Sequence, residues 1–236
     1  MGTSQSYAPP TGHLWNPAKR GVTNLINENA SSESIGKALR KHVEAVRSNK
    51  GTYNSKNQKI VSSAGRAINF INDVQTMGLD AALEGHGLSN LIGKGFDEVF
   101  VGLLDYFVED NSSIDGTIAR DSMAELMSEM MSIDEFEEEI NEMDMNNFIK
   151  DYIVKYVQKD FMVHYAEKIL AACDNINKTI SIQNKVKDFI KTVISQNYSP
   201  VEISKIDWKG QEGNQIINQI HKDTIDIFLM WGDSLG

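Results

Sequence analysis

The residues at the start of the chain, MGTSQSY, have the types and order that an accessible nucleophile needs. Because Gly2 is small, Met1 can be removed after synthesis, which leaves a free glycine α-amine. An α-amine loses its proton more readily than a lysine side chain does, so a useful fraction of it is an uncharged nucleophile at neutral pH. Glycine adds no side chain that would obstruct this amine. Gly2 is therefore a candidate site of covalent modification.

The side chains that follow Gly2 are suited to seating such an amine in the groove of a partner. Thr3, Ser4 and Ser6 each donate and accept hydrogen bonds. Tyr7 can anchor the strand, because aromatic rings are strong interface residues. Two other interpretations stay open: the start of a chain is commonly disordered, and MGTSQS fits the short pattern for N-myristoylation.

Two glycine-containing segments look like nucleotide or calcium loops but fail on spacing. In residues 85–96, GHGLSNLIGKGF, five residues separate Gly87 from Gly93 where a phosphate-binding loop has four, and Lys94 is not followed by Ser or Thr. In residues 110–116, DNSSIDG, the glycine stands at position seven of the loop, whereas a calcium loop has it at position six. The sequence predicts neither site.

The histidines and the single cysteine form no metal-ligand pattern. The five histidines are scattered without an HxxxH pair or a nearby thiolate, so we predict no metal and no cofactor. His42 lies on an apolar helical stripe and is interpreted as a hydrogen-bonded core residue. Cys173 has no neighbouring cation that would activate its thiol and is interpreted as structural. No catalytic triad or carboxylate pair can be recognised from spacing, although folding can assemble one.

Charge is distributed unevenly over the 236 residues. The net charge is −10, with +7 in residues 1–70, −17 in residues 71–145 and 0 in residues 146–236. A net acidic chain with one basic end is a poor general nucleic-acid binder, so the basic end is expected to face the acidic middle of the chain or an acidic partner. One cysteine and the lack of a transmembrane or secretory pattern predict a cytoplasmic protein that does not enter a membrane.

Helical periodicity predicts an all-α fold, a multi-helix globular bundle with an extended N-terminal tail. Residues 1–18 are the expected tail, because Gly12 and Pro17 interrupt a helix. Residues 19–236 are the expected single all-α domain. Apolar spacing indicates helices over residues 35–46, 60–74, 88–107, 118–131, 148–170, 180–194 and 215–231.

Local signals refine this pattern of helices. Ser31 and Ser32 are candidate N-caps, Gly78 is a candidate C-cap, and Ser48–Asn57 has the composition of a loop. The acidic segment 134–144 is interpreted as the solvated face of a helix that turns Phe136, Ile140 and Met143 inward. The methionine stripe is interpreted as adaptable core, with a partner groove as the alternative; it comprises Met123, Met127, Met130 and Met131.

Three segments together resemble a known family. They are MGTSQSY at residues 1–7, GKALRKHV at residues 36–43 and, above all, DEVFVGLLDYFVEDNSSIDGTIARDSMAE at residues 97–125. These segments are similar to QatB, the small helical component of the Qat anti-phage defence system. Relatives often have a longer Gly/Pro-rich linker after the opening, whereas here about ten residues separate Tyr7 from Ala18. The shorter linker reduces the reach of the tail, since an extended chain covers roughly 3.3 Å per residue.

The resemblance implies a setting and a partner. It implies an operon with a predicted ATPase, a QueC-like enzyme (QatC) and a TatD-like nuclease. QueC-type enzymes adenylate a carboxyl-deazaguanine and let an amine attack it, so the resemblance implies that QatC joins a 7-deazaguanine base to Gly2 of a non-enzymatic protein. The alternative is an adaptor that bridges the ATPase and the other subunits with an inert tail. Lipid-anchored targeting ranks last, because the implied bacterial host lacks the usual acyltransferase.

Overall fold

The structure is a computed structural model that describes residues 12–109, 112–130, 136–200, 206 and 211–231. Two compact units make up the chain, and the division between them falls inside α3, α8 and α10. Unit 1 comprises Met1–Asn54, Val157–Tyr198 and Lys222–Gly236, and unit 2 comprises Ser55–Tyr156 and Ser199–His221. The expectation of a single domain over residues 19–236 stays a prediction.

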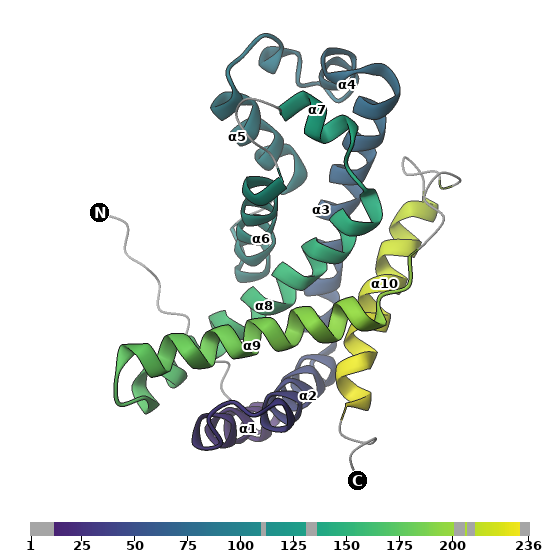
Figure 1. The fold of residues 1–236 in the computed structure, drawn as a ribbon. Helices are drawn as coiled ribbons and strands as arrows, with labels where there is room; N and C mark the ends of the chain where they lie inside the picture. The colour runs from purple at the N-terminus through teal and green to yellow at the C-terminus, as the bar shows by residue number, and fades with distance from the viewer. Residues whose placement is uncertain (1–11, 110–111, 131–135, 201–205, 207–210, 232–236) are drawn as a thin grey trace. The chain divides into compact units, whose positions relative to one another are not determined.

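The all-α fold is confirmed, because the described residues form ten α-helices and no strand (Figure 1). The helices are α1 (Asn16–Asn27), α2 (Ser32–Ser48), α3 (Lys50–Met77), α4 (Leu79–Gly85), α5 (Phe96–Phe107), α6 (Ile114–Met130), α7 (Phe136–Asn141), α8 (Met145–Ala172), α9 (Ile176–Asn197) and α10 (Gln211–Met230). Two short 3-10 turns, η1 (His13–Trp15) and η2 (Ser89–Leu91), complete them. None of the described helices is both long and apolar enough to cross a membrane.

In unit 1, α2 packs against α1 on one side and against α9 on another. The predicted cap at its start is confirmed, because the Ser31 hydroxyl oxygen accepts the N–H of Ser34 at 3.2 Å. The apolar stripe predicted for this helix is buried, with Ile35, Leu39 and Val43 at most 4% exposed. The apolar periodicity and the Ser31 cap together therefore explain why this segment forms α2.

The start of α1 differs from the predicted tail. Helix begins at Asn16, inside the range 1–18 that was expected to be extended. Pro17 does not interrupt it, because proline in the first turn lacks only an N–H that has no partner inside the helix. Gly12, with φ of 127°, lies directly before η1.

The loop predicted over Ser48–Asn57 is wrong. Asn49 alone separates α2 from α3, and its φ of −102° and ψ of 90° break the helix for one residue. Its side-chain oxygen then accepts the N–H of Thr52 at 3.3 Å, so Asn49 caps the helix that follows. Turn-forming residues at this place serve a helix start rather than a loop.

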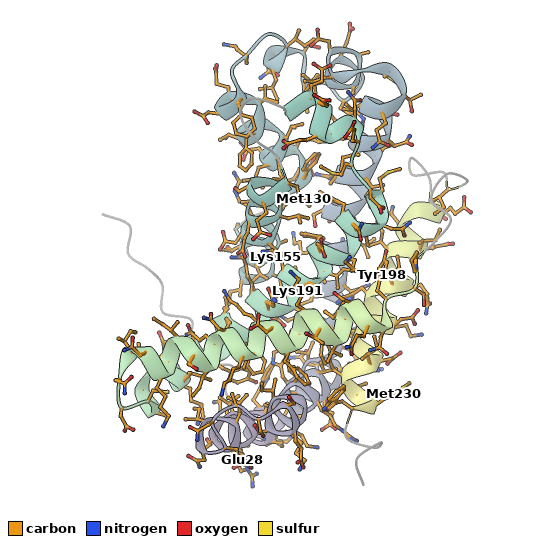
Figure 2. The ribbon with its side chains drawn as sticks, in the orientation of Figure 1. Glu28, Met130, Lys155, Lys191, Tyr198 and Met230 are labelled. Atoms are coloured by element: carbon orange, nitrogen blue, oxygen red, sulfur yellow. The ribbon has the colours of Figure 1, made fainter. Side chains whose placement is uncertain are left out.

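In unit 2, caps and buried polar pairs hold the helices. Gly78 ends α3 with a φ of 86°, and its N–H donates to the carbonyl of Val74 at 2.8 Å, as the predicted C-cap requires. The start of α6 is capped by Ser113, whose hydroxyl oxygen accepts the N–H of Gly116 at 3.0 Å. Lys155, labelled in Figure 2, extends from α8 to α6 and donates to Glu125 at 2.8 Å.

The acidic segment has the solvated arrangement that the sequence predicted. In and just after α7, Ile140 and Met143 are buried while Glu137 and Glu138 are exposed. The amide nitrogen of Gln75 on α3 donates to the carbonyls of Ile140 at 3.2 Å and of Met143 at 2.9 Å. This short helix is therefore fixed by backbone contacts, and the side chain of Phe136 lies outside the described residues.

Candidate functional site

The predicted modification and partner-binding residues Gly2, Thr3, Ser4, Ser6 and Tyr7 lie outside the described residues. Their roles therefore stay predictions. The described chain begins at Gly12, and the first buried side chain after it is Trp15. What the structure contributes to this site is the place where the N-terminal segment joins the folded unit.

Trp15 fixes the beginning of the folded chain in unit 1. Its side chain is 4% exposed and stacks on His164 of α8, with ring centroids 5.5 Å apart and an interplanar angle of 4°. Its ring centroid also lies 5.7 Å from that of His42 on α2. Burial of a tryptophan among aromatic rings holds a segment firmly, so the residues before Gly12 start from a fixed point.

The rings beneath Trp15 belong to a hydrogen-bonded chain of three side chains, which we call the His42 chain: Asp160, His42 and Tyr165. The His42 Nε2 lies 3.0 Å from the Asp160 carboxylate, and its Nδ1 lies 3.2 Å from the Tyr165 hydroxyl. Burial raises the pKa of Tyr165, so its hydroxyl keeps its proton. A carboxylate can only accept, so Nε2–H donates to Asp160, and the Tyr165 hydroxyl is the partner of Nδ1.

This arrangement confirms the interpretation of His42 as a hydrogen-bonded core residue. His42 is 4% exposed and Asp160 is 8% exposed. His164 adds a bond of 2.6 Å from its Nδ1 to the Asp160 carbonyl. The sequence did not indicate Asp160 or Tyr165 as partners, because they follow His42 by more than a hundred residues.

A second chain with the same order of atoms lies in unit 2, and we call it the His86 chain: Asp73, His86 and Tyr106. The His86 Nε2 lies 2.9 Å from the Asp73 carboxylate, and its Nδ1 lies 2.6 Å from the Tyr106 hydroxyl. Burial raises the pKa of Tyr106, which keeps this phenol protonated as well. Arg66 holds the far end, donating to the Tyr106 carbonyl at 3.2 Å and to Glu109 at 2.6 Å.

The His86 chain borders a cavity of about 590 Å³, which we call the α3 cavity. One face of α3 lines it with residues three or four apart: Ser62, Gly65, Arg66, Asn69, Asp73 and Met77. Gly85 and His86, at the end of α4, and Asn214, in the first turn of α10, line it as well. The sequence analysis missed this site, because Asp73 and His86 belong to no motif.

Chemically, the α3 cavity offers hydrogen-bond acceptors and a carboxylate. The side-chain oxygen of Asn69 is buried and has no hydrogen-bond partner. Within the described part of the chain no group of three or more His, Cys, Asp or Glu side chains is placed to hold a metal ion. Ser62, the hydroxyl in the lining, donates to the Lys59 carbonyl at 3.3 Å. The described lining is polar, with Asp73 and Arg66 as its charged residues.

Other residues singled out in the sequence take structural places. Met123 and Met127 are fully buried in α6, which confirms them as core, and Met130 is half-buried. Met131 lies outside the described residues. Cys173 is a half-buried free thiol.

Fold and geometry define an all-α protein whose described residues hold a buried and a half-buried His-Asp-Tyr chain, the latter beside a polar cavity. The family model described as Qat anti-phage system associated protein QatB matches residues 50–228, so the chain belongs to the QatB family. No curated protein and no solved structure matches it. As a component of the Qat system it works with other proteins of that system. The match includes the whole α3 cavity and begins well after the N-terminal segment.

Proposed function

We propose that this chain is a non-enzymatic component of anti-phage defence that binds the QueC-like enzyme QatC and offers its N-terminal glycine for conjugation. The observation that carries the proposal is membership of the QatB family combined with an opening, MGTSQSY, that supplies an unobstructed α-amine. Thr3, Ser4, Ser6 and Tyr7 seat the strand in the active site of QatC. The helical body serves as the docking surface.

The proposed step is an acyl transfer whose activated partner QatC supplies. QatC uses ATP to convert the carboxyl group of a 7-deazaguanine into an acyl-adenylate, and pyrophosphate leaves in this first step. The uncharged α-amine of Gly2 attacks the acyl carbon, a C–N bond forms, the C–O bond to AMP breaks, and the nitrogen releases one proton. The products are an amide between base and protein, AMP and a proton. This chain contributes the nucleophile and its position.

The anchored Trp15 supports this use of the N-terminal segment. Gly2 precedes Trp15 by thirteen residues, which can span at most roughly 47 Å. A strand that starts from a buried, stacked tryptophan has a defined origin on unit 1. QatC is therefore expected to bind this chain with its active site within that distance of Trp15.

Intact-mass spectrometry after co-expression with QatC tests the proposal. We expect the N-terminal peptide to gain the mass of the deazaguanine acyl group in the presence of QatC and to remain unchanged with a QatC variant that cannot bind ATP. Gly2→Val, which crowds the amine, should remain largely unmodified, while Gly51→Val is the matched control in exposed chain and should be modified normally.

Two outcomes would contradict the proposal. One is an unmodified N-terminal peptide in cells that contain active QatC, and the other is equal modification of the Gly2→Val protein. The adaptor alternative predicts that the N-terminal tail is not needed for phage protection. If deletion of residues 2–7 leaves both complex formation and protection intact, the tail is inert and the chain is a scaffold.

A further inference from the structure

We infer that the α3 cavity is a binding site for a primary ammonium group, supplied by a small amine or by a lysine side chain. This inference concerns unit 2 and does not depend on the proposed conjugation of Gly2. The volume of the α3 cavity, about 590 Å³, lies within the range of small-ligand pockets, roughly 300–1,000 Å³. The chemistry of its lining identifies the ligand.

The first observation is an acceptor without a donor. The Asn69 side-chain oxygen is buried in the lining, and no hydrogen-bond donor among the described residues reaches it. A buried polar atom that is left unsatisfied destabilises the fold, and native proteins rarely keep one without a reason. A ligand N–H at this place would satisfy it.

The second observation is a second acceptor brought close by a glycine. A Cβ atom at Gly65 would lie only 2.9 Å from the side-chain oxygen of Asn214. Glycine at this position therefore lets the Asn214 carbonyl approach α3 one turn of helix from Asn69. An ammonium group carries three N–H donors and no acceptor, which suits a site built from several oxygens.

The third observation is the charge of the lining. The Asp73 side chain is 9% exposed and accepts a hydrogen bond from His86, whose ring is fixed in turn by Tyr106. Arg66, the cation in this lining, directs its guanidinium to Glu109 and to the Tyr106 carbonyl. The Asp73 carboxylate is therefore the charged acceptor in this lining that a cationic ligand would meet.

The same lining disfavours three other ligands. An anion would meet the carboxylate of Asp73, and a nucleobase would find no aromatic ring in the described lining except the imidazole of His86. A divalent cation prefers several charged oxygens, and the described residues provide no group of three metal-binding side chains. An ammonium group needs only the acceptors that are present.

Titration calorimetry on the full-length protein tests the inference with two primary amines. One is 1,5-diaminopentane, a free amine, and the other is Nα-acetyl-lysine N-methylamide, a lysine side chain in peptide form. We expect saturable binding of at least one, and the tighter of the two identifies the source. Tetramethylammonium, which carries the charge without N–H donors, should bind at least tenfold more weakly.

Variants of Asn69 locate the binding. Asn69→Leu should weaken the amine roughly tenfold or more, and Asn69→Asp, which adds a carboxylate, should tighten it several-fold. Asn72→Leu, the same substitution three residues along α3 and outside the lining, is the matched control and should bind normally. Asn69→Asp is expected to bind the amine more tightly, and a folding defect cannot produce that result. The test therefore remains decisive even if Asn69→Leu fails to fold.

The inference is overturned if neither amine binds or if both Asn69 variants bind as the unchanged protein does. Equal binding of tetramethylammonium would also overturn it, and so would tighter binding of inorganic phosphate. None of these results bears on the modification of Gly2, which is read from the N-terminal mass. The two proposals therefore fail separately.

Discussion

The His42 chain of unit 1 and the His86 chain of unit 2 join the same side chains through the same atoms, yet their surroundings differ. In both, Nε2 faces an aspartate and Nδ1 faces a tyrosine hydroxyl. Aromatic rings surround His42 on several sides, with the centroids of Trp15, Phe161 and His164 within 5.7 Å. His86 and Asp73 instead border the α3 cavity.

The difference shows that a hydrogen-bonded chain does not by itself make a functional site. In the His42 chain aromatic rings pack around the imidazole, so the polar atoms serve to fix α2, α8 and the start of the described chain in place. In the His86 chain the same order of atoms fixes a carboxylate at the edge of open space. Packing around the imidazole therefore separates a structural role from a binding role, and the three predictions below test that separation.

The largest effect is expected from removing the ring that closes the His42 chain. Trp15→Ala should lower the free energy of unfolding by about 3–5 kcal/mol, because it leaves a cavity over His42 and His164. Urea denaturation measures this. Leu14→Ala is the matched control, because the side chain of Leu14 is 39% exposed, and it should change the free energy by less than about 1 kcal/mol. Equal losses in the two variants would contradict the packing described for Trp15.

A smaller effect should distinguish the two aspartates. Asp160→Asn should cost roughly 2–3 kcal/mol of unfolding free energy, because the charge-assisted bond from His42 is lost and the imidazole of His164 also faces this carboxylate at 3.3 Å. Asp73→Asn should cost roughly 1 kcal/mol, because water in the α3 cavity can hydrogen-bond to His86. Denaturation of both variants in one buffer compares them. An equal loss of unfolding free energy in the two variants would mean that water in the α3 cavity does not replace the hydrogen bond that His86 loses.

The smallest expected effect is on the pH dependence of stability, to which Tyr165 and Tyr106 should contribute unequally. Burial raises the pKa of Tyr165 and of half-buried Tyr106, so in alkali the unfolded chain loses phenol protons that the folded chain keeps. The contribution is fully present below the ordinary phenol pKa and is lost as pH rises above it, by up to about 1.4 kcal/mol per pH unit for each group.

Replacing each phenol should therefore change the slope of stability against pH. Tyr165→Phe should cost about 1 kcal/mol at neutral pH and make the decline between pH 10 and 11 less steep. Tyr106→Phe should flatten the decline less, because the residue is less buried. Unfolding free energies measured from pH 8 to 11 give both slopes. Identical slopes in the two variants and the unchanged protein would contradict the assignment.

Much of the fold could be predicted from the sequence, because apolar spacing reports local structure. The helices predicted over residues 148–170 and 180–194 correspond to α8 and α9, and Ser31 caps α2 as predicted. One exception is the helix predicted over residues 88–107, of which only Phe96–Phe107 forms α5, after the 3-10 turn Ser89–Leu91. Another is Ser48–Asn57, where composition indicated a loop and Asn49 caps α3. Composition alone does not separate a turn from a helix start, because both use the same residues.

The sites could be predicted less well, because their partners are distant in sequence. The place of His42 on an apolar stripe sufficed to identify a core histidine, whereas nothing near it in sequence indicated Asp160. The α3 cavity depends on Asn69, whose polar side chain on a helix face reads as ordinary surface until α4 and α10 are placed beside it. Gly2, in contrast, was identified from residue type alone, and its role awaits the mass measurement.

The assembly of unit 1 from three separated stretches has a consequence for the order of events in synthesis. Helices α1 and α2 leave the ribosome early, but α9 and the indole of Trp231, which lies against Gly36, are made last. Chains are made from the N-terminus at roughly 5–20 residues per second, so the first fifty residues wait several seconds or longer for the surfaces that complete their core. A nascent chain therefore cannot hold Trp15 in place until these later segments have been made. Stable burial of Trp15 would then mark a chain whose synthesis is complete.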